Sequence, residues 1–336
     1  MATMNDVARV AQVSIATVSH VINGTRFVSP ERVERVQSAM RELDYTPDAT
    51  ARSLRVGRTN TIGLVIPDNS NPFFAELARR IEEAGFDAGY TTILGNSGER
   101  PDREHQYVST LLSKRIDGLI IAPFRAVDRA LTRLLLKAPI PTVVIDREDV
   151  LPTADVVLHD DAGGGRQAAQ HLLELGHREI ACVADPPHDA PSPGRLEGFL
   201  QALAAAGVDV PEDAIVQGDY HFESGREATR RLLATGRRFT ALFAANDLMA
   251  AGAIREALAH GLRVPEDLSV VGFDDAPLAE MISPALTTVR QPLQQMGDTA
   301  VSLLLARMDA GEAEPRSRQV LPTSLVVRDS TAAPRA

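Results

Sequence analysis

Polar side chains stand where several short apolar runs of this sequence end. They are Asp68, Asn71, Asp146, Arg147, Asn246, Asp247, Asp274 and Asp275. Ligands of open parallel sheets bind in the crevice outside the carboxyl ends of the strands, so we expect these side chains to converge on one cleft. Carboxylate, guanidinium and amide groups can together hold several ligand hydroxyls through charge-assisted hydrogen bonds. Each residue alone could instead be a helix cap or a turn residue, and only their recurrence favours a binding site.

Aromatic residues could complete such a site. Phe73, Phe74 and Tyr220 offer flat faces that can pack against the C–H side of a sugar ring. A purine would favour stacking with fewer paired carboxylates. The residue types therefore favour a hydroxylated small molecule.

An enzymatic use of the same carboxyls is the competing interpretation. Asp146 and Asp274 could form the pair of a glycoside hydrolase, in which one carboxyl has a raised pKa. Arg147 and Arg195 are expected to keep both carboxyls ionised instead. The sequence also lacks a nucleophile elbow, a phosphate loop and a dinucleotide-binding fingerprint. We therefore expect a binding protein that is not an enzyme and has no cofactor.

No metal site is expected from the sequence. The single cysteine, Cys182, lies inside the apolar run "EIACVAD", where a buried thiol is the ordinary interpretation. The eight histidines are scattered, and none is paired with a carboxylate at the spacing of a zinc-binding helix.

The elements that carry the polar residues predict an α/β core. From Thr61 onward, short apolar runs alternate with amphipathic stretches, which is typical of parallel sheets covered by helices on both faces. The runs are too numerous for one sheet and indicate two doubly wound lobes. Gly163 to Gly165 are expected to form a turn and helix start at the crossing between the lobes. The predicted parts are an N-terminal lobe of 59–160 with part of 292–320, a C-terminal lobe of 161–291 with 321–330, and a disordered tail of 331–336.

The first 47 residues predict a separate all-α head. A helix over Met4 to Ala11 is followed by the turn "QVS", a second helix capped by Ser14, and a third that begins at Ser29-Pro30-Glu31. Two helices joined by a short turn and braced by a third form a helix-turn-helix unit. A small bundle that binds protein is the alternative.

The second helix of the head carries side chains that could read DNA. Ser14, Ile15, Ala16, Thr17 and His20 lie around its start and outer side, where such residues can contact base edges and thymine methyl groups in a major groove. The charge distribution agrees with this assignment. Residues 1–58 carry a net charge of +2 and the rest of the chain −12, so the head is the part suited to phosphate contact.

The segment "DATARSLR", within a predicted hinge helix and linker of 48–58, has helical composition but is too short to be stable alone. Its one large apolar side chain, Leu54, has no apolar partner at helical spacing. Elsewhere, no apolar run approaches the length of a membrane span, and the polar N-terminus is unlike a signal peptide. We therefore expect a cytoplasmic protein with no membrane contact.

Five ordered motifs resemble the lac repressor family of bacterial transcription regulators. They are "MNDVARVAQVSIATVSHVINGTRFVS", "PDATARSLRVGRTNTIGLVIPD", "AANDLMAAGA", "LSVVGFDD" and "ALTTVRQP". The resemblance extends to about residue 328, and the head is most similar to the ribose and purine repressors. It implies a homodimer with a helix-turn-helix head, a hinge helix and a periplasmic-binding-protein-like core, which binds double-stranded operator DNA.

The resemblance also implies a use for Leu54. In the family, the matching segment folds when two hinges pair on the operator, and the matching leucine wedges into the minor groove. An apolar wedge partly unstacks a base step and kinks the duplex, while Arg55 can line the narrow groove. Arg26 is similar to a base-contacting arginine.

For the ligand, the resemblance to the periplasmic ribose-binding protein implies a sugar effector, ribose-like or another pentose. The matching positions are Asn71, Phe73, Phe74, Asp146, Arg147, Arg195, Tyr220, Asn246, Asp274 and Gln291. One departure is the segment "GERPD" around Glu99, which lacks the family's asparagine. A purine corepressor is the alternative, although Asp189 and Pro191 stand where an arginine and a threonine would grip the base. A stand-alone sugar-binding protein is a third possibility, disfavoured by the absent signal peptide.

Overall fold

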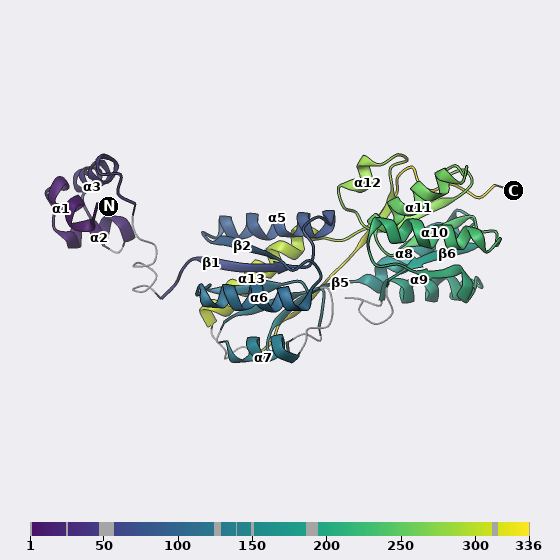
Figure 1. The fold of residues 1–336 in the computed structure, drawn as a ribbon, viewed down its shortest axis with the longest axis horizontal. Helices are drawn as coiled ribbons and strands as arrows, with labels where there is room; N and C mark the ends of the chain where they lie inside the picture. The colour runs from purple at the N-terminus through teal and green to yellow at the C-terminus, as the bar shows by residue number, and fades with distance from the viewer. Residues whose placement is uncertain are drawn as a thin grey trace. The chain divides into compact units, whose positions relative to one another are not determined.

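The computed structural model describes residues 2–24, 26–46, 57–123, 129–138, 140–148, 151–185, 194–310 and 315–335. Two compact units make up the chain, Met1–Thr59 and Asn60–Ala336, and each is described separately (Figure 1). Residues 48–56 of the predicted hinge and linker (48–58) lie outside the described residues.

The described part of the head contains three helices, which the sequence predicts. They are α1 (Met4–Ala11), α2 (Ile15–Asn23) and α3 (Pro30–Glu42). Their core consists of Val7, Ala8, Ala11, Val18, Val36 and Ala39, all of which are buried. Apolar side chains from all three helices therefore hold this small unit together.

Local signals set the ends of the head helices. Thr3 and Asp6 form a capping box at α1, Ser14 accepts a hydrogen bond from the backbone N–H of Thr17 at α2, and Gly24 ends α2 with φ +61°. The expectation for α3 was partly wrong. Ser29 occupies its N-cap position, but the side chain makes no capping hydrogen bond, so Pro30 at the first helical position is the effective start signal.

The core alternates strands and helices from Thr61 onward. Its N-terminal part contains β1 (Thr61–Ile66), α5 (Pro72–Asp87), β2 (Thr91–Asn96), α6 (Pro101–Ser113), β3 (Gly118–Ile121), α7 (Arg129–Lys137), β4 (Thr142–Ile145) and β5 (Asp155–His159). Next come α8 (Asp161–Glu174), β6 (Ile180–Ala184), α9 (Gly194–Ala205), the 3₁₀ turn η1 (Glu212–Ala214), β7 (Ile215–Gln217), α10 (Phe222–Ala234), β8 (Ala241–Ala244) and α11 (Asp247–Ala259). The chain ends with β9 (Ser269–Asp274), α12 (Leu278–Met281), β10 (Thr287–Arg290), α13 (Leu293–Ala310), β11 (Arg318–Leu321) and β12 (Ser324–Val326).

Two six-stranded sheets form the two lobes. Lobe 1 has the strand order β11-β5-β4-β3-β1-β2, and every neighbouring pair is parallel. Lobe 2 has the order β12-β10-β9-β8-β6-β7, parallel except where β12 pairs with β10. The predicted doubly wound fold of both lobes is confirmed.

Helices cover both faces of each sheet (Figure 1). In lobe 1, α5 and α13 pack on one face around Leu77, Ile81 and Met296, while α6 and α7 pack on the other. In lobe 2, α10 and α11 cover one face and α8 and α9 the other. The continuous burial of strands such as β3 and β4 follows from this double cover.

The chain passes between the lobes three times, after β5, after β10 and after β11. The boundaries predicted at 160, 291 and 320 fall at these crossings, although Leu321 belongs to β11 of lobe 1. Of the helices in the described ranges, none has both the length and the apolar character needed to span a bilayer.

The expectation of a disordered tail is wrong for residues 331–335. The Thr331 hydroxyl lies 2.9 Å from Nε2 of His171, and the Ala332 carbonyl oxygen accepts a hydrogen bond from Nε2 of His177 at 2.9 Å. The Ala332 N–H donates to Oγ of Ser269 at 3.0 Å. Two of these three contacts are made by backbone atoms of Ala332. The side chains of the tail therefore do not predict them.

The predicted helix start at Gly163 to Gly165 is confirmed, but the glycines lie inside the first turn of α8 rather than in a turn before it. Asp160 caps α8 through the N–H of Gly163. A Cβ on Gly165 would lie 2.1 Å from the carbonyl oxygen of Arg195, and one on Gly198 would lie 2.1 Å from that of Ala162. The backbones of α8 and α9 therefore pack directly against each other, which places Asp161 beside Arg195.

Changing Gly198 to alanine tests this close packing. Alanine normally stabilises an exposed helix interior relative to glycine, but here the added methyl group meets the backbone of Ala162. We expect Gly198→Ala to lower the free energy of unfolding of the core by about 1–3 kcal/mol, measured by urea denaturation. Gln201→Ala, on the exposed side of the same helix, is the control. A stabilised Gly198→Ala core would contradict the packing described here.

Candidate functional site

The outer side of α2 presents the predicted DNA-reading residues. Ser14, Ile15 and Ala16 are exposed, whereas Thr17 and His20 are half-buried, and Val18 on the opposite side is fully buried. The hydroxyls of Ser14 and Thr17 lie 2.9 Å apart and bond to each other. Ile15, with 49% of its surface exposed, is thus an apolar side chain without a core role.

The other predicted DNA contacts are Arg26, Leu54 and Arg55. Arg26 is exposed beyond the end of α2. Leu54 and Arg55 lie outside the described residues. The hinge assignment therefore still rests on the sequence.

In the core, the guanidinium of Arg195 is the centre of a buried polar cluster. Nε donates to Oδ1 of Asp161 at 2.7 Å, and Nη1 donates both to the carbonyl oxygen of Ala245 at 2.8 Å and to Oδ1 of Asp274 at 3.2 Å. The Phe273 ring lies 4.2 Å from the guanidinium carbon, a cation–π arrangement. Gln291 completes this side by donating from Nε2 to Oδ1 of Asp274 at 2.7 Å.

His159 joins this cluster to lobe 1. It ends β5, and Asp146 follows β4, so both side chains lie at the carboxyl edge of the lobe 1 sheet. Nε2 of His159 lies 2.8 Å from Oδ1 of Asp161, and Nδ1 lies 3.1 Å from Oδ1 of Asp146. Residues from both lobes are thus connected through one imidazole ring.

Burial and neighbouring charges set the protonation of the cluster. Burial alone would lower the pKa of His159, but the carboxylates of Asp161 and Asp146 outweigh burial and raise that pKa. Burial raises the pKa of Asp161 as well, yet His159 and Arg195 bring it below its ordinary value. The favoured state is an imidazolium and a guanidinium on either side of an ionised Asp161.

The expectation that arginine neighbours hold the pKa values of Asp146 and Asp274 low is wrong. Burial raises the pKa of Asp146 despite His159 nearby, and it raises the pKa of Asp274 to about 7 despite Arg195. Desolvation outweighs the ion pair because both carboxyls are almost fully excluded from water. The neighbouring arginines therefore do not exclude an acid–base role for Asp146 and Asp274. The argument against an enzyme rests instead on the catalytic motifs that the sequence lacks.

Some predicted site residues also serve the fold. Asn71 caps α5 by accepting from the N–H of Phe73, and Asn246 caps α11 by accepting from the N–H of Met249. Asp247 is buried and accepts from the Thr288 hydroxyl and the Ala276 N–H. Asp275 pairs with Arg290 and Arg328, outside the Arg195 cluster. These four residues therefore have the structural roles that the sequence offered as the alternative. A capping role for Asn71 and Asn246 is compatible with a ligand contact.

The predicted aromatic residues differ in their surroundings. Phe73 is buried in the lobe 1 core and meets Phe74 edge to face, with ring centroids 5.0 Å apart. Phe74 is half-buried, so it retains more surface for a ligand than Phe73. Tyr220 is half-buried in lobe 2, its carbonyl oxygen accepts from Nδ2 of Asn246 at 2.9 Å, and its hydroxyl interacts with Asp185.

Three members of the cluster were missed by the sequence analysis. His159, Asp161 and Asp185 each follow an apolar run, in "DVVLHDD" and "IACVAD". The rule that identified Asp146 and Asp274 would have found them as well. Arg147, which the sequence did predict, is buried next to Asp146 and contributes positive charge to it.

Polar atoms of the cluster remain without hydrogen-bond partners among the described residues. They are Oδ2 of Asp161 and Oε1 of Gln291, both fully buried. Such groups are costly unless water or a ligand satisfies them. Ligand atoms on Asp146, His159 and Asp161 also lie close enough to hold a metal ion, but Arg195 already places its positive charge on Asp161.

Comparisons with known proteins identify two regions. Residues 3–48 match the bacterial regulatory proteins, lacI family, and residues 169–331 match the periplasmic binding protein-like domain. The HTH-type transcriptional repressor PurR of Klebsiella pneumoniae (strain 342) is 43% identical over 333 residues, which cover 99% of this chain and 97% of that protein. Relatives of this kind are repressors rather than enzymes, in agreement with the expected absence of catalysis.

Solved structures agree with the observed fold. The lac repressor dimer bound to operator and the anti-inducer ONPF is 32% identical with a TM-score of 0.87, and the match covers 99% of each chain. A LacI family transcriptional regulator from Enterococcus faecium with bound ribose is 34% identical with a TM-score of 0.72. That match covers 81% of this chain and 99% of the other.

The buried carboxyl of Asp274 should make core stability depend on pH. Its pKa of about 7 in the folded protein lies above its ordinary value, so folding binds a proton and stability falls as pH rises from about 4 to 7. We expect Asp274→Asn to reduce this loss, by up to about 1.4 kcal/mol for each unit of pKa shift removed. Urea denaturation between pH 5 and 8 measures it, with exposed Asp298→Asn as the control. Parallel stability curves for Asp274→Asn and the unmodified protein would refute the assignment.

Proposed function

The chain belongs to the lacI family of bacterial regulatory proteins and is a DNA-binding transcriptional repressor with an effector-binding core, and we propose that its effector is a small polyhydroxylated ring, a pentose or a related sugar. The binding site would be the Arg195 cluster between the lobes. Binding there would control operator affinity.

The unpartnered buried atoms of the cluster carry this proposal. Oδ2 of the ionised Asp161 carboxylate and Oε1 of the Gln291 amide accept hydrogen bonds and cannot donate them. A sugar hydroxyl can donate a hydrogen bond to either atom. Arg195 and Arg147 can in turn donate to hydroxyl or ring oxygens. A ring with several hydroxyls can both donate and accept, and so matches a site that contains carboxyl, guanidinium and amide groups together.

Aromatic surface in both lobes supports the same class of ligand. Half-buried Phe74 begins α5 in lobe 1, and half-buried Tyr220 precedes α10 in lobe 2. Packing of their rings on the C–H faces of a sugar would add apolar contact to the polar cluster. The relative from Enterococcus faecium was solved with ribose, which supports a pentose for this chain as well.

A purine corepressor is the second candidate. The full-length similarity to the PurR repressors favours it, and a purine could also bond to Arg195 and Asp274. The departures at Asp189 and Pro191 fall outside the described residues. The density of buried carboxyls is the observation that places the sugar first.

Control of DNA binding requires coupling between the core and the head. An effector shifts the relation of the two lobes only as far as it binds one arrangement more tightly than the other. We propose that two chains associate, so that their hinge segments pair on a two-fold symmetric operator. A sugar that weakens this pairing acts as an inducer, whereas a purine corepressor would strengthen it.

Calorimetry can separate the two effector classes. We expect D-ribose or a related pentose to bind the full-length protein and hypoxanthine not to bind. Asp161→Asn should weaken sugar binding about 10-fold or more, because a hydrogen bond to a charged group is worth about 1.5–3 kcal/mol. Exposed Asp298→Asn is the matched control, and operator titrations with ligand should show weaker DNA binding. Hypoxanthine binding together with stronger operator binding would decide for the purine alternative.

Leu54 tests the hinge separately from the effector. If its side chain is buried in the minor groove, Leu54→Ala should weaken operator binding about 10- to 100-fold, because burying a leucine contributes about 1.5–3 kcal/mol. Core melting and effector affinity should not change. Leu136→Ala, at an exposed leucine of α7, is the control. Unchanged operator affinity in Leu54→Ala would rule out the wedge.

A further inference from the structure

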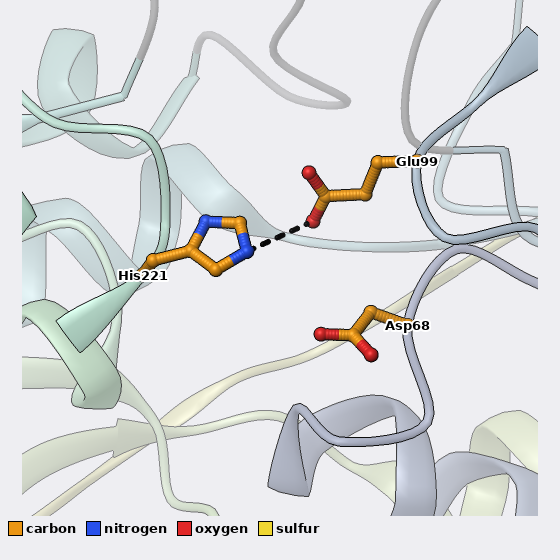
Figure 2. Close-up of side chains that lie close together, drawn as sticks. All are labelled: Asp68, Glu99 and His221. Atoms are coloured by element: carbon orange, nitrogen blue, oxygen red, sulfur yellow. Dashed lines mark ion pairs between the residues drawn. The ribbon is translucent and has the colours of Figure 1, made fainter. Parts of the chain in front are cut away.

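A second polar cluster joins the two lobes outside the Arg195 cluster. Asp68 follows β1 and Glu99 follows β2, both in lobe 1, while His221 precedes α10 in lobe 2. Their side chains point toward one another (Figure 2). Three separate segments thus bring two carboxylates and an imidazole to one place.

The spacing of the donor atoms suits a small cation. Nε2 of His221 lies 3.4 Å from Oε1 of Glu99, and all three ligand atoms lie within 4.8 Å of one another. A tetrahedral zinc ion with bonds of about 2.0–2.1 Å separates its ligand atoms by roughly 3.3 Å. The His221–Glu99 distance already matches that separation, and a small rotation of Asp68 would bring its carboxylate into place.

The hydrogen bonding of His221 prepares Nε2 to be a ligand. Nδ1 lies 2.9 Å from the carbonyl oxygen of Asp219, and a carbonyl oxygen can only accept. Nδ1 therefore carries a proton, and a bound metal ion would replace the proton on Nε2, the ring nitrogen that faces Glu99. A backbone carbonyl that fixes the second nitrogen in this way is the usual support of a metal-binding histidine.

The carboxylates and the surroundings add to this preparation. Asp68 is oriented by the N–H and the hydroxyl of Ser70, which donate to Oδ1 at 2.9 and 2.8 Å. The carboxylate of Asp219 lies 3.3 Å from Nδ1 of His221 and adds a third negative charge. The His221 side chain is 46% exposed, so an ion can reach it from solvent.

We propose that Asp68, Glu99 and His221 form a binding site for a divalent transition ion of the zinc class, which ties lobe 1 to lobe 2. One nitrogen and two carboxylate oxygens leave at least one coordination position for water or for an oxygen of another ligand. Because its donors come from both lobes, the bound ion stabilises the arrangement that brings them together. Ion binding is thereby coupled to the lobe movement on which the effector also acts.

Binding of Zn²⁺ and Co²⁺ to the untagged full-length protein tests this site. Calorimetry at pH 7.5 should find one Zn²⁺ per chain, and bound Co²⁺ should show the intense visible absorption of a site with few ligands. His221→Ala should lose affinity at least about 100-fold and Glu99→Gln at least about 10-fold, because even supporting residues of metal sites contribute 10- to 100-fold. Zn²⁺ should also shift the sugar affinity of the unmodified protein and leave that of His221→Ala unchanged.

His260→Ala provides the matched control. Its imidazole is 42% exposed and lies 3.6 Å from a carboxylate of Glu256 on the same helix, so it resembles His221 in exposure and in having a carboxylate neighbour, but that neighbour does not come from the other lobe. Equal losses in both variants, or no binding below millimolar Zn²⁺, would overturn the proposal. A response to pH without a response to Zn²⁺ would also overturn it and would leave a His221–Glu99 ion pair as the contact. Metal binding is read without effector, so failure here is distinguishable from failure of the sugar assignment.

Discussion

The burial of one guanidinium group constrains much of the core. Arg195 is excluded from water and would be strongly unfavourable there without partners, because desolvation of a charge costs more than a single ion pair returns. Asp161, Asp274 and the Ala245 carbonyl oxygen provide those partners, and all three come from different elements of lobe 2. Their positions require α8 and α9 to approach closely, which explains the glycines where the two helices meet.

The same cluster joins the lobes because His159 reaches it from lobe 1. The imidazole lies between Asp146 and Asp161, so the charge state of the cluster depends on how the lobes are arranged. Asp68, Glu99 and His221 make a second, more exposed connection. A ligand at either place would act on the same relation between the lobes.

Much of the architecture could be predicted from local patterns. The alternation of apolar runs with amphipathic stretches is a property of consecutive residues, and it correctly indicated two doubly wound lobes and a three-helix head. Ser14 and Gly24 act on residues next to them, so their effects at α2 were also predictable. Polar residues after apolar runs pointed to the carboxyl edges of the sheets, and Asp146, Arg195, Asp274 and Gln291 do meet there.

The sequence could not determine which of these residues form the site, because that depends on desolvation and on neighbours far away along the chain. Asp247 and Asp274 follow similar runs, yet one braces β10 through Thr288 and the other faces Arg195. The pKa of Asp274 could not be inferred from the presence of arginine, since burial outweighs the ion pair. The position of the tail likewise depends on lobe 2 side chains: His177 donates a hydrogen bond to the Ala332 carbonyl oxygen, and Ser269 accepts one from the Ala332 N–H. Periodicity is local and can be read from the chain, whereas burial and long-range pairing exist only once the lobes have packed.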